Sequence, residues 1–204
     1  MSIVLVCGKK RSGKSTLSKI FVTKYGYKEI ALADNLKKVC QELIKFFYDM
    51  NININELHDK SKDFGGFSIR KYTKTCCSAK KLKRVINIKN DKTFTYRKLM
   101  QWLGTDILRH YFGDDIHINS ILKDIDPKSS YIISDCRFQN EVDIIKKYGI
   151  SKDMKVKIIF IKRNTNLSGF EHKSEEVIIT GEDIIIENNG PIKNLEEIVS
   201  KLLK

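Results

Sequence analysis

The sequence contains little proline, a single tryptophan and no long apolar run. Its 204 residues include 2 Pro and 1 Trp. The chain therefore holds no proline-rich linker, and no repeat or shift in composition marks a domain boundary. No apolar stretch approaches the ~20 residues that a membrane-spanning helix needs, and no signal peptide precedes the first strand-like segment. We expect one globular, cytoplasmic domain without a membrane partner.

Cysteine is present in an odd number and without metal-binding spacing. The 5 Cys residues include the adjacent pair Cys76 and Cys77, and none of them form a C-x-x-C pattern. This pattern argues against a disulfide framework and against a zinc site, and it indicates reduced thiols.

Acidic residues are too few to balance the basic ones. The chain carries 25 Asp and Glu against 38 Lys and Arg, which gives a formal net charge of +13 at pH 7. The imbalance is concentrated in residues 69–98, where eleven basic residues are opposed only by Asp91. Such a segment is compatible with a nucleic-acid patch, an anionic-substrate site or a solvated face.

The most informative motif is the phosphate-loop pattern G-x-x-x-x-G-K-[ST], which Gly8–Ser15 fits. The apolar, β-branched run Ile3–Cys7 precedes it and predicts a buried parallel strand. Leu17, Ile20 and Phe21 follow at helical spacing. Strand, glycine-rich turn and helix are the context in which this motif binds phosphate. The sequence therefore predicts a nucleoside triphosphate site.

The chemistry of the motif assigns roles within it. Glycines let the backbone wrap a phosphate chain, so that the loop amides and the helix N-terminus point at the anion. Lys14 would reach the β- and γ-phosphates, and the Ser15 hydroxyl would ligate Mg²⁺. We expect ATP and Mg²⁺ as cofactors, and the loop residues that bind them are Gly8, Lys10, Arg11, Ser12, Gly13, Lys14, Ser15 and Thr16.

Apolar periodicity predicts alternating strands and helices along the rest of the chain. Strands are expected at Tyr131–Asp135, Val156–Ile161 and Ile184–Ile186. Helices are expected at Asp34–Tyr48 (with the apolar stripe Leu36, Val39, Cys40, Leu43 and Phe47), at about Tyr96–His110, after the strand Tyr131–Asp135 (through Val142 and Ile145 to a C-cap at Gly149), and at Leu195–Leu202. This alternation predicts a three-layer α/β fold, with a parallel sheet flanked by helices and ligands at the carboxyl ends of the strands. Residues 50–93 are irregular and read as an insertion with short helices or a hairpin.

A phosphate loop alone leaves a motor ATPase, a switch GTPase and a small-molecule kinase open. No Asn/Thr-Lys-x-Asp motif for guanine is present, and the chain is short for a motor. A kinase whose acceptor is itself a phosphate needs no general base, because the acceptor oxygen, with a second pKa of about 6, is mostly ionised near pH 7. It needs cations that cancel the repulsion between two anions. The basic residues at strand ends and helix starts suit that need.

Three segments are candidates to supply these groups. Asp135 and Arg137 close an apolar strand, where Asp135 would hold a Mg²⁺-bound water and Arg137 would bind a phosphate. The alternative for this pair is a plain surface ion pair. The block Arg97–Asp106 would turn its polar residues toward a substrate. The loop Arg163–Glu175 follows a strand and would form a lid over ATP.

Together these segments resemble the deoxynucleoside monophosphate kinases of phages and large DNA viruses, a family with a P-loop nucleotide-kinase-like fold. Five blocks occur in the family's order: K-R-S-G-K at 10–14, R-x-L-M-Q-x-L-G-T-D at 97–106, D-x-R-x-x-x-E at 135–141, H-x-[ST]-E at 172–175, and Asn and Gly followed by L-E-E within 188–197. The resemblance is weakest across residues 50–93. This chain has Ser15 where the family often has Asp, and His117 where the family tends to have Trp, so no base preference is transferred.

The resemblance implies which residues serve the transfer of a phosphoryl group from ATP to a deoxynucleoside monophosphate. The implied catalytic residues are Lys14, Arg97, Asp135 and Arg137. The implied acceptor site consists of Asp34, Lys37, Arg97, Gln101, Gly104, Thr105, Asp135, Arg137, Glu141, His172 and Glu175. Arg163 and Asn188 would contact ATP, Asn188 near the adenine, and the lid with Arg163 and His172 would exclude water.

The resemblance also implies the organisation of the chain. A single P-loop kinase domain would have its core at 1–49 and 94–204, a helical monophosphate-binding insertion at about 50–93 and a lid at about 163–176. Its partners would be the two small-molecule substrates, without a stable nucleic-acid complex, and a homodimer is allowed. The protein would work in the cytoplasm, which is the host's cytoplasm if the chain is viral.

Two other interpretations stay open at this point. Animal-type phosphomevalonate kinases share the Gly-Lys-Lys-Arg-Ser-Gly-Lys loop, the Ser-Asp-x-Arg strand end and the Ile-Glu-Asn-x-Gly terminus, and they act on an acceptor without a base. A DNA-binding P-loop ATPase would use residues 69–98 and would bind DNA in a strongly salt-dependent way. The block Arg97–Asp106 and the H-x-S-E lid favour the nucleotide kinase.

Overall fold

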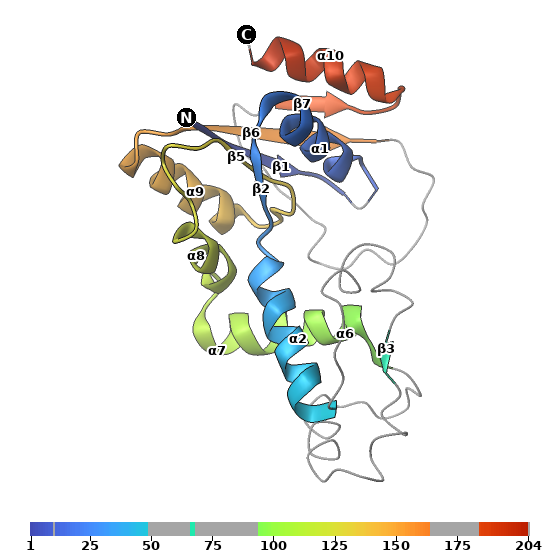
Figure 1. Cartoon of the computed structure of the whole chain (residues 1–204), viewed down its shortest axis with the longest axis vertical. Coiled ribbons are helices and arrows are strands. Elements are labelled where there is room, and N and C mark those ends of the chain that lie inside the picture. The colour runs from blue at the N-terminus through green and yellow to red at the C-terminus, as the bar shows by residue number, and fades with distance from the viewer. Residues whose placement is uncertain (10, 49–65, 68–93, 164–183, 204) are drawn as a thin grey trace. The chain divides into compact units, whose positions relative to one another are not determined.

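A computed structural model describes residues 1–9, 11–48, 66–67, 94–163 and 184–203 (Figure 1). The chain divides into two compact units, the first made of Met1–Leu32 and Ile118–Lys204 and the second of Ala33–His117. The first unit contains β1 (Ser2–Cys7), α1 (Lys14–Tyr25), β2 (Lys28–Ile30), most of α8 (Ile116–Leu122), β5 (Tyr131–Ile133), α9 (Gln139–Ser151), β6 (Lys155–Lys162), β7 (Ile184–Glu187) and α10 (Ile192–Leu202). The second contains α2 (Asp34–Tyr48), β3 (Gly66–Phe67), β4 (Phe94–Thr95), α6 (Tyr96–Gln101), the π-helix η2 (Trp102–Arg109) and α7 (His110–Phe112).

The first unit is built on a five-stranded sheet in the order β2-β5-β1-β6-β7, and every pairing in it is parallel. The central strand is β1, with β5 and β2 on one side and β6 and β7 on the other. In open parallel sheets, ligands bind at the carboxyl end of the strand where the order diverges. The loop Gly8–Gly13 leaves β1 at that end. The expected parallel sheet is confirmed.

Alternation along β1 explains the two helix layers. Ile3, Leu5 and Cys7 belong to a buried cluster completed by residues of α8 and α9. Val4 and Val6 belong to a second cluster, completed by residues of α1 and α10. Because both faces of the sheet are covered, every position from residue 3 to residue 7 is apolar and buried. The three-layer α/β fold expected from the sequence is confirmed.

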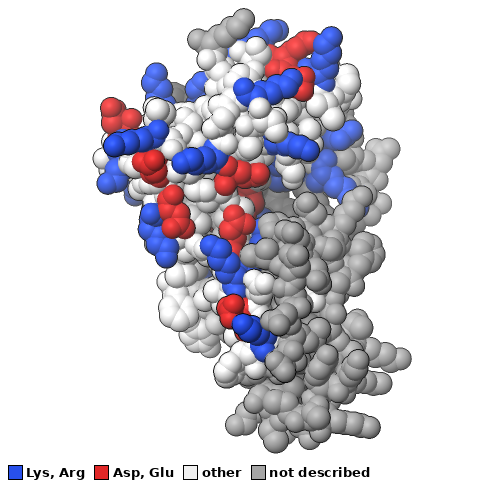
Figure 2. All heavy atoms as spheres, in the orientation of Figure 1, with Lys and Arg blue, Asp and Glu red and all other residues white. Residues whose placement is uncertain are grey.

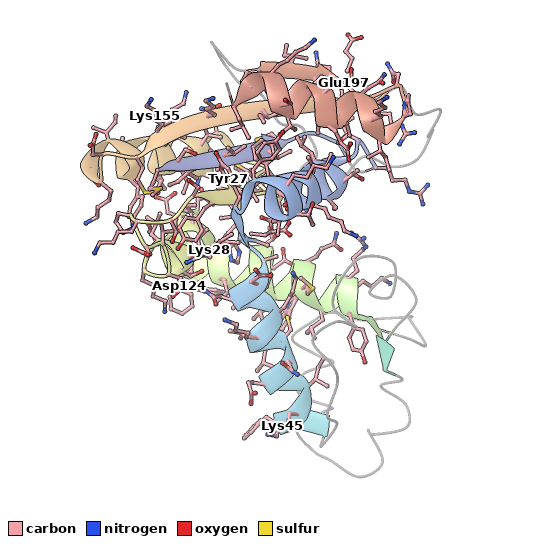
Figure 3. The ribbon with its side chains drawn as sticks, turned by 45° about the horizontal axis from the view of Figure 1, so that its top comes forward. Tyr27, Lys28, Lys45, Asp124, Lys155 and Glu197 are labelled. Atoms are coloured by element: carbon pink, nitrogen blue, oxygen red, sulfur yellow. The ribbon has the colours of Figure 1, made fainter. Side chains whose placement is uncertain are left out.

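Tyr27, which Figure 3 labels, lies just before the edge strand β2. Its ring meets Phe21 edge-on at a centroid distance of 5.0 Å, and its hydroxyl is hydrogen-bonded to Ser2 Oγ at 2.7 Å. The sequence pattern does not predict β2, because its residues Lys28–Ile30 are exposed or half-buried and form no apolar run.

The C-cap expected at Gly149 is wrong, because α9 continues to Ser151. Gly149 lies in the last turn of the helix, where a Cβ atom would run into Val156 of β6 and would lie 3.0 Å from the carbonyl oxygen of Met154. The left-handed residue after the helix is Asp153, with a φ of 51°. Close approach of strand and helix, rather than chain reversal, accounts for the glycine.

In the second unit, α2 has the bounds expected from the sequence. Its buried stripe is Leu36, Cys40 and Ile44, at a spacing of four residues. Val39 was expected in that stripe, but it is 44% exposed, since a residue three places after Leu36 falls to one side of a stripe with this spacing.

A helix over residues 96–110 is confirmed, but its middle is π-helical, with hydrogen bonds from residue i to residue i+5. The expected insertion at 50–93 lies almost wholly outside the described residues. Within this insertion the structure describes Gly66–Phe67, which pair in antiparallel fashion with Phe94–Thr95.

Figure 2 shows basic and acidic side chains interspersed over the described part of the visible face. Most of the basic segment 69–98 lies outside the described residues. None of the helices in the described part of the chain has the length and apolarity needed to cross a membrane.

Candidate active site

The loop between β1 and α1 has the backbone conformation of an anion-binding turn. Gly8 and Gly13 have φ values of 146° and 107°, and Arg11 lies in the left-handed region with a φ of 64°. The Ser12 N–H donates to the Lys9 carbonyl at 3.2 Å. Left-handed residues that alternate with ordinary ones turn successive amide N–H groups to one side, which forms a concave site for phosphate.

Lys14, the first residue of α1, folds back over this loop. Its ammonium group donates to the carbonyl oxygens of Gly8 and Lys9, each at 2.7 Å. A charged phosphate oxygen binds an ammonium group more strongly than a neutral carbonyl does, which makes Lys14 the candidate cation for a phosphate chain.

Two serine hydroxyls of the loop region are also compatible with a bound triphosphate. Ser12 is 2% exposed, and its Oγ has no hydrogen-bond partner among the described residues. An exposed hydroxyl, that of Ser15, stands at the beginning of α1 and is the candidate Mg²⁺ ligand. Mg²⁺ in such sites takes most of its ligands from phosphates and water, and no cluster of three His, Cys, Asp or Glu side chains occurs in the part of the chain that the structure describes.

Gly8 allows a test of the loop's packing. A Cβ at Gly8 would run into the backbone carbonyl of Ile161. We expect Gly8→Ala to abolish measurable ATP binding and to lower the free energy of unfolding by about 1–3 kcal/mol. Gly26→Ala is the matched control, because Gly26 also has a positive φ, of 69°, but a Cβ there meets nothing within 4 Å. Equal ATP affinity in the two variants, measured by calorimetry, would contradict this account of the loop.

The end of β5 carries the second group of predicted residues. Asp135 accepts a hydrogen bond at Oδ1 from the Leu32 N–H at 2.8 Å, which ties the chain after β2 to the end of β5. Arg137 is exposed. Cys136 between them is buried, and a hydrogen bond with Cys7 together with burial raises its pKa well above the ordinary value. Its thiol therefore stays protonated at neutral pH and is not a candidate nucleophile.

Glu141 lies at the start of α9 and holds the Arg137 segment in place. Its carboxylate is 3% exposed and accepts from the backbone N–H groups of Arg137 at 2.8 Å and of Phe138 at 3.0 Å. This is the carboxylate half of a capping box, which satisfies donors that the helix leaves unpaired. The structure thus gives Glu141 a contact with the backbone of Arg137.

We expect Glu141→Ala to lower the free energy of unfolding by about 1–3 kcal/mol, because two partly buried N–H groups lose their acceptor. Asp143→Ala is the control, since Asp143 is an exposed residue of the same helix whose carboxylate accepts a hydrogen bond from the Gln139 side chain. Chemical denaturation of both variants measures the difference. If Glu141→Ala were no less stable than Asp143→Ala, the capping role would be wrong.

Glu29 is a residue that the sequence pattern did not single out. Its Oε1 accepts hydrogen bonds from Ser18 Oγ at 2.6 Å and from Ser134 Oγ at 2.9 Å. These contacts connect the phosphate-loop helix α1, the edge strand β2 and the end of β5. No local signal marks Glu29, because the two hydroxyls come from residues 11 and 105 positions away.

In the second unit, the structure places the predicted acceptor residues on α2, α6 and η2. Lys37 is 6% exposed and forms an ion pair with Asp34 at 2.8 Å. His117 Nε2 is hydrogen-bonded to the Gly104 carbonyl at 3.0 Å. A Cβ at Gly104 would lie 2.8 Å from Leu36 Cδ2, so this glycine lets η2 pack closely against α2.

The remaining predicted residues differ in exposure and in whether the structure describes them. Arg97 is half-buried, and Gln101 and Thr105 are exposed. Arg163 is exposed at the end of the described segment, and Asn188 is buried against the phosphate loop. Lys10, His172 and Glu175 lie outside the described residues, as does nearly all of the expected lid.

Comparison with known proteins gives several matches. The chain is 29% identical over 220 residues to a protein of Acanthamoeba polyphaga mimivirus that is named as a deoxynucleotide monophosphate kinase, with 100% of this chain and 95% of that one covered. It is 25% identical to the deoxynucleotide monophosphate kinase of Enterobacteria phage T4, with coverage of 99% and 97%. An APS kinase of Mycobacterium tuberculosis in complex with AMPPNP and APS matches with a TM-score of 0.43 and 10% identity, with coverage of 99% and 96%. That structural likeness is too weak to support a functional conclusion.

The sheet, the phosphate loop at its central strand and the helix that follows define an α/β protein of the phosphate-loop class. A family model described as "Deoxynucleotide monophosphate kinase" matches residues 41–199. The chain belongs to the deoxynucleotide monophosphate kinase family. The expectation of an enzyme that phosphorylates a nucleoside monophosphate is confirmed, and the phosphomevalonate kinase and DNA-binding ATPase are not favoured.

Proposed function

We propose that the protein transfers the γ-phosphoryl group of Mg²⁺-bound ATP to a deoxynucleoside monophosphate, giving ADP and the diphosphate. The observation that carries the proposal is the pairing of β1 with β5, in which Leu5 is level with Ile133. Neighbouring strands lie about 4.8 Å apart. The phosphate loop at the end of β1 and Arg137 after β5 therefore belong to the same edge of the sheet, which suits a reaction between two phosphates.

On the donor side, the loop amides and Lys14 would bind the β- and γ-phosphates. The Ser15 hydroxyl would hold Mg²⁺, with Asp135 assisting through a bound water. The metal ion, when bound, neutralises charge on the phosphate oxygens. The Lys14 ammonium group would follow the transferred phosphoryl group as its charge develops, which is the kind of contact that accelerates the chemical step.

On the acceptor side, Arg137 would bind the monophosphate with its two-pronged guanidinium group. For the second unit, the family resemblance implies that Arg97, Thr105 and the Asp34–Lys37 pair bind the acceptor. No general base is needed, because the monophosphate oxygen is already ionised at neutral pH. The family resemblance implies a lid over ATP at about 163–176, nearly all of which lies outside the described residues.

The test of this function separates transfer from hydrolysis. The purified protein is incubated with Mg²⁺ and ATP labelled at the γ-phosphate, with and without a mixture of the four deoxynucleoside monophosphates. We expect the label to appear in a deoxynucleoside diphosphate and hydrolysis without acceptor to be slow. Label that appears only as inorganic phosphate, at a rate independent of the acceptor, would show an ATPase instead.

A further inference from the structure

Asn188 lies with its side chain against the backbone of the phosphate loop. Its side chain is buried, and Nδ2 donates a hydrogen bond to the Ser12 carbonyl oxygen at 2.8 Å. Its own backbone N–H donates to the carbonyl of Lys162 at 2.7 Å, and Lys162 pairs with Glu187 as the last pair between β6 and β7. A side chain fixed to the edge of the sheet is thus bonded to a loop 176 residues away in sequence.

The contact determines how the Ser12–Gly13 peptide is turned. Every described peptide bond is trans, and in a trans peptide the C=O and the following N–H point in opposite directions. With the Ser12 carbonyl directed at Asn188, the Gly13 N–H is directed away from it. Gly13 is the N-cap of α1, so this N–H is among the donors that a helix N-terminus offers to an anion.

The packing leaves little room for another arrangement. A Cβ at Gly13 would run into Asn188 Nδ2, so the asparagine amide lies directly against the glycine. The helix that follows Asn188, α10, shares one buried cluster with α1 and is joined to it by the ion pair between Lys24 and Glu196 at 2.7 Å. Figure 1 shows α10 beside β7 on the α1 side of the sheet.

We infer that Asn188 is a positioning residue for triphosphate binding: it turns the Ser12–Gly13 peptide so that the Gly13 amide faces the phosphates. This role differs from the contact near adenine that the family resemblance implies, because it requires no nucleoside. The inference depends on the proposed function only in that the loop binds the triphosphate of ATP.

The test uses ligands that contain only one part of ATP. Tripolyphosphate with Mg²⁺ carries the phosphates, and adenosine carries the base and sugar. Affinities of the full-length wild type, Asn188→Ala and the exposed neighbour Asn189→Ala are measured by titration for both probes and for ATP. We expect Asn188→Ala to weaken tripolyphosphate and ATP about tenfold and to leave adenosine within about twofold, with Asn189→Ala unchanged.

Loss of adenosine affinity in Asn188→Ala, or unchanged tripolyphosphate affinity, would overturn the inference. A wild type that binds neither tripolyphosphate nor ATP would instead overturn the proposed function itself. If Asn188→Ala does not fold, Asn188→Asp serves in its place, because it keeps the shape of the side chain and replaces the donor with an acceptor. A variant that merely destabilised the protein would lower the melting temperature without separating the two probes.

Discussion

Replacing Lys14 with alanine is expected to lower kcat by about 10³-fold or more while the protein stays folded. The Lys14 side chain is half-buried, and its ammonium group donates hydrogen bonds to two loop carbonyls, each at 2.7 Å. Its removal therefore takes a charge from the phosphate site without leaving a cavity. The loss falls mainly on the chemical step, because the cation interacts most strongly with the charge that develops during transfer.

Steady-state kinetics with saturating ATP and acceptor measures this effect, and far-UV circular dichroism checks the fold. Lys19→Ala is the matched control, because Lys19 is an exposed lysine of the same helix α1. We expect the control to keep the wild-type rate within about twofold, as is usual for surface substitutions. Near-normal turnover by Lys14→Ala would remove the phosphate loop from the active site.

Replacing Arg137 with alanine is expected to affect the acceptor more than the donor. We expect KM for the monophosphate to rise by about 10²-fold, with kcat also reduced, while the dissociation constant of ATP changes by no more than about twofold. The reason is that Arg137 follows β5, whereas the loop that would bind ATP follows β1. A guanidinium group can form two parallel hydrogen bonds with a phosphate, and that of Arg137 is exposed.

Two further variants sharpen this prediction. Arg137→Lys keeps the charge but loses the second hydrogen bond, so its KM should fall between those of the wild type and Arg137→Ala. Lys147→Ala, on the exposed surface of α9, controls for the removal of a positive charge from the same part of the chain. An equal loss of ATP and monophosphate binding in Arg137→Ala would assign the arginine to the donor site.

The central part of the fold follows from local sequence. The run Ile3–Cys7 is apolar at every position because both faces of β1 are covered, and this feature is visible in the sequence without a structure. The phosphate-loop motif then fixes where the chain must turn, since glycine is needed at Gly8 and Gly13 to reach positive φ values. Sheet class, loop and first helix could therefore be predicted together.

Other elements depend on contacts that local patterns do not record. The strand β2 consists of Lys28–Ile30, whose polar residues become a strand only because β5 offers an edge. Gly149 has the sequence signal of a helix C-cap, but it lies within the helix, where its missing side chain lets Val156 pack closely. The π-helix η2 has the same apolar spacing of four residues as an α-helix, so periodicity does not distinguish the two.

In the candidate site, too, some features follow from local sequence and others depend on contacts between distant residues. Lys14 and the loop glycines were predicted from one contiguous motif, and the structure places them together. Asp135, Arg137 and Glu141 were predicted as lining residues; the structure adds that Glu141 holds the backbone of Arg137 and that Asp135 holds Leu32. Contacts such as Asn188 with Ser12 join residues far apart in the chain, and only the folded arrangement reveals them.

The most direct test of the central claim is a coupled ADP-release assay with ATP and Mg²⁺, in which each acceptor is supplied separately. The acceptors are the four deoxynucleoside monophosphates, the four ribonucleoside monophosphates and phosphomevalonate. We expect turnover with one or more deoxynucleoside monophosphates, which would also give the base preference. Turnover with phosphomevalonate alone, or with no acceptor at all, would contradict the assignment of the acceptor site.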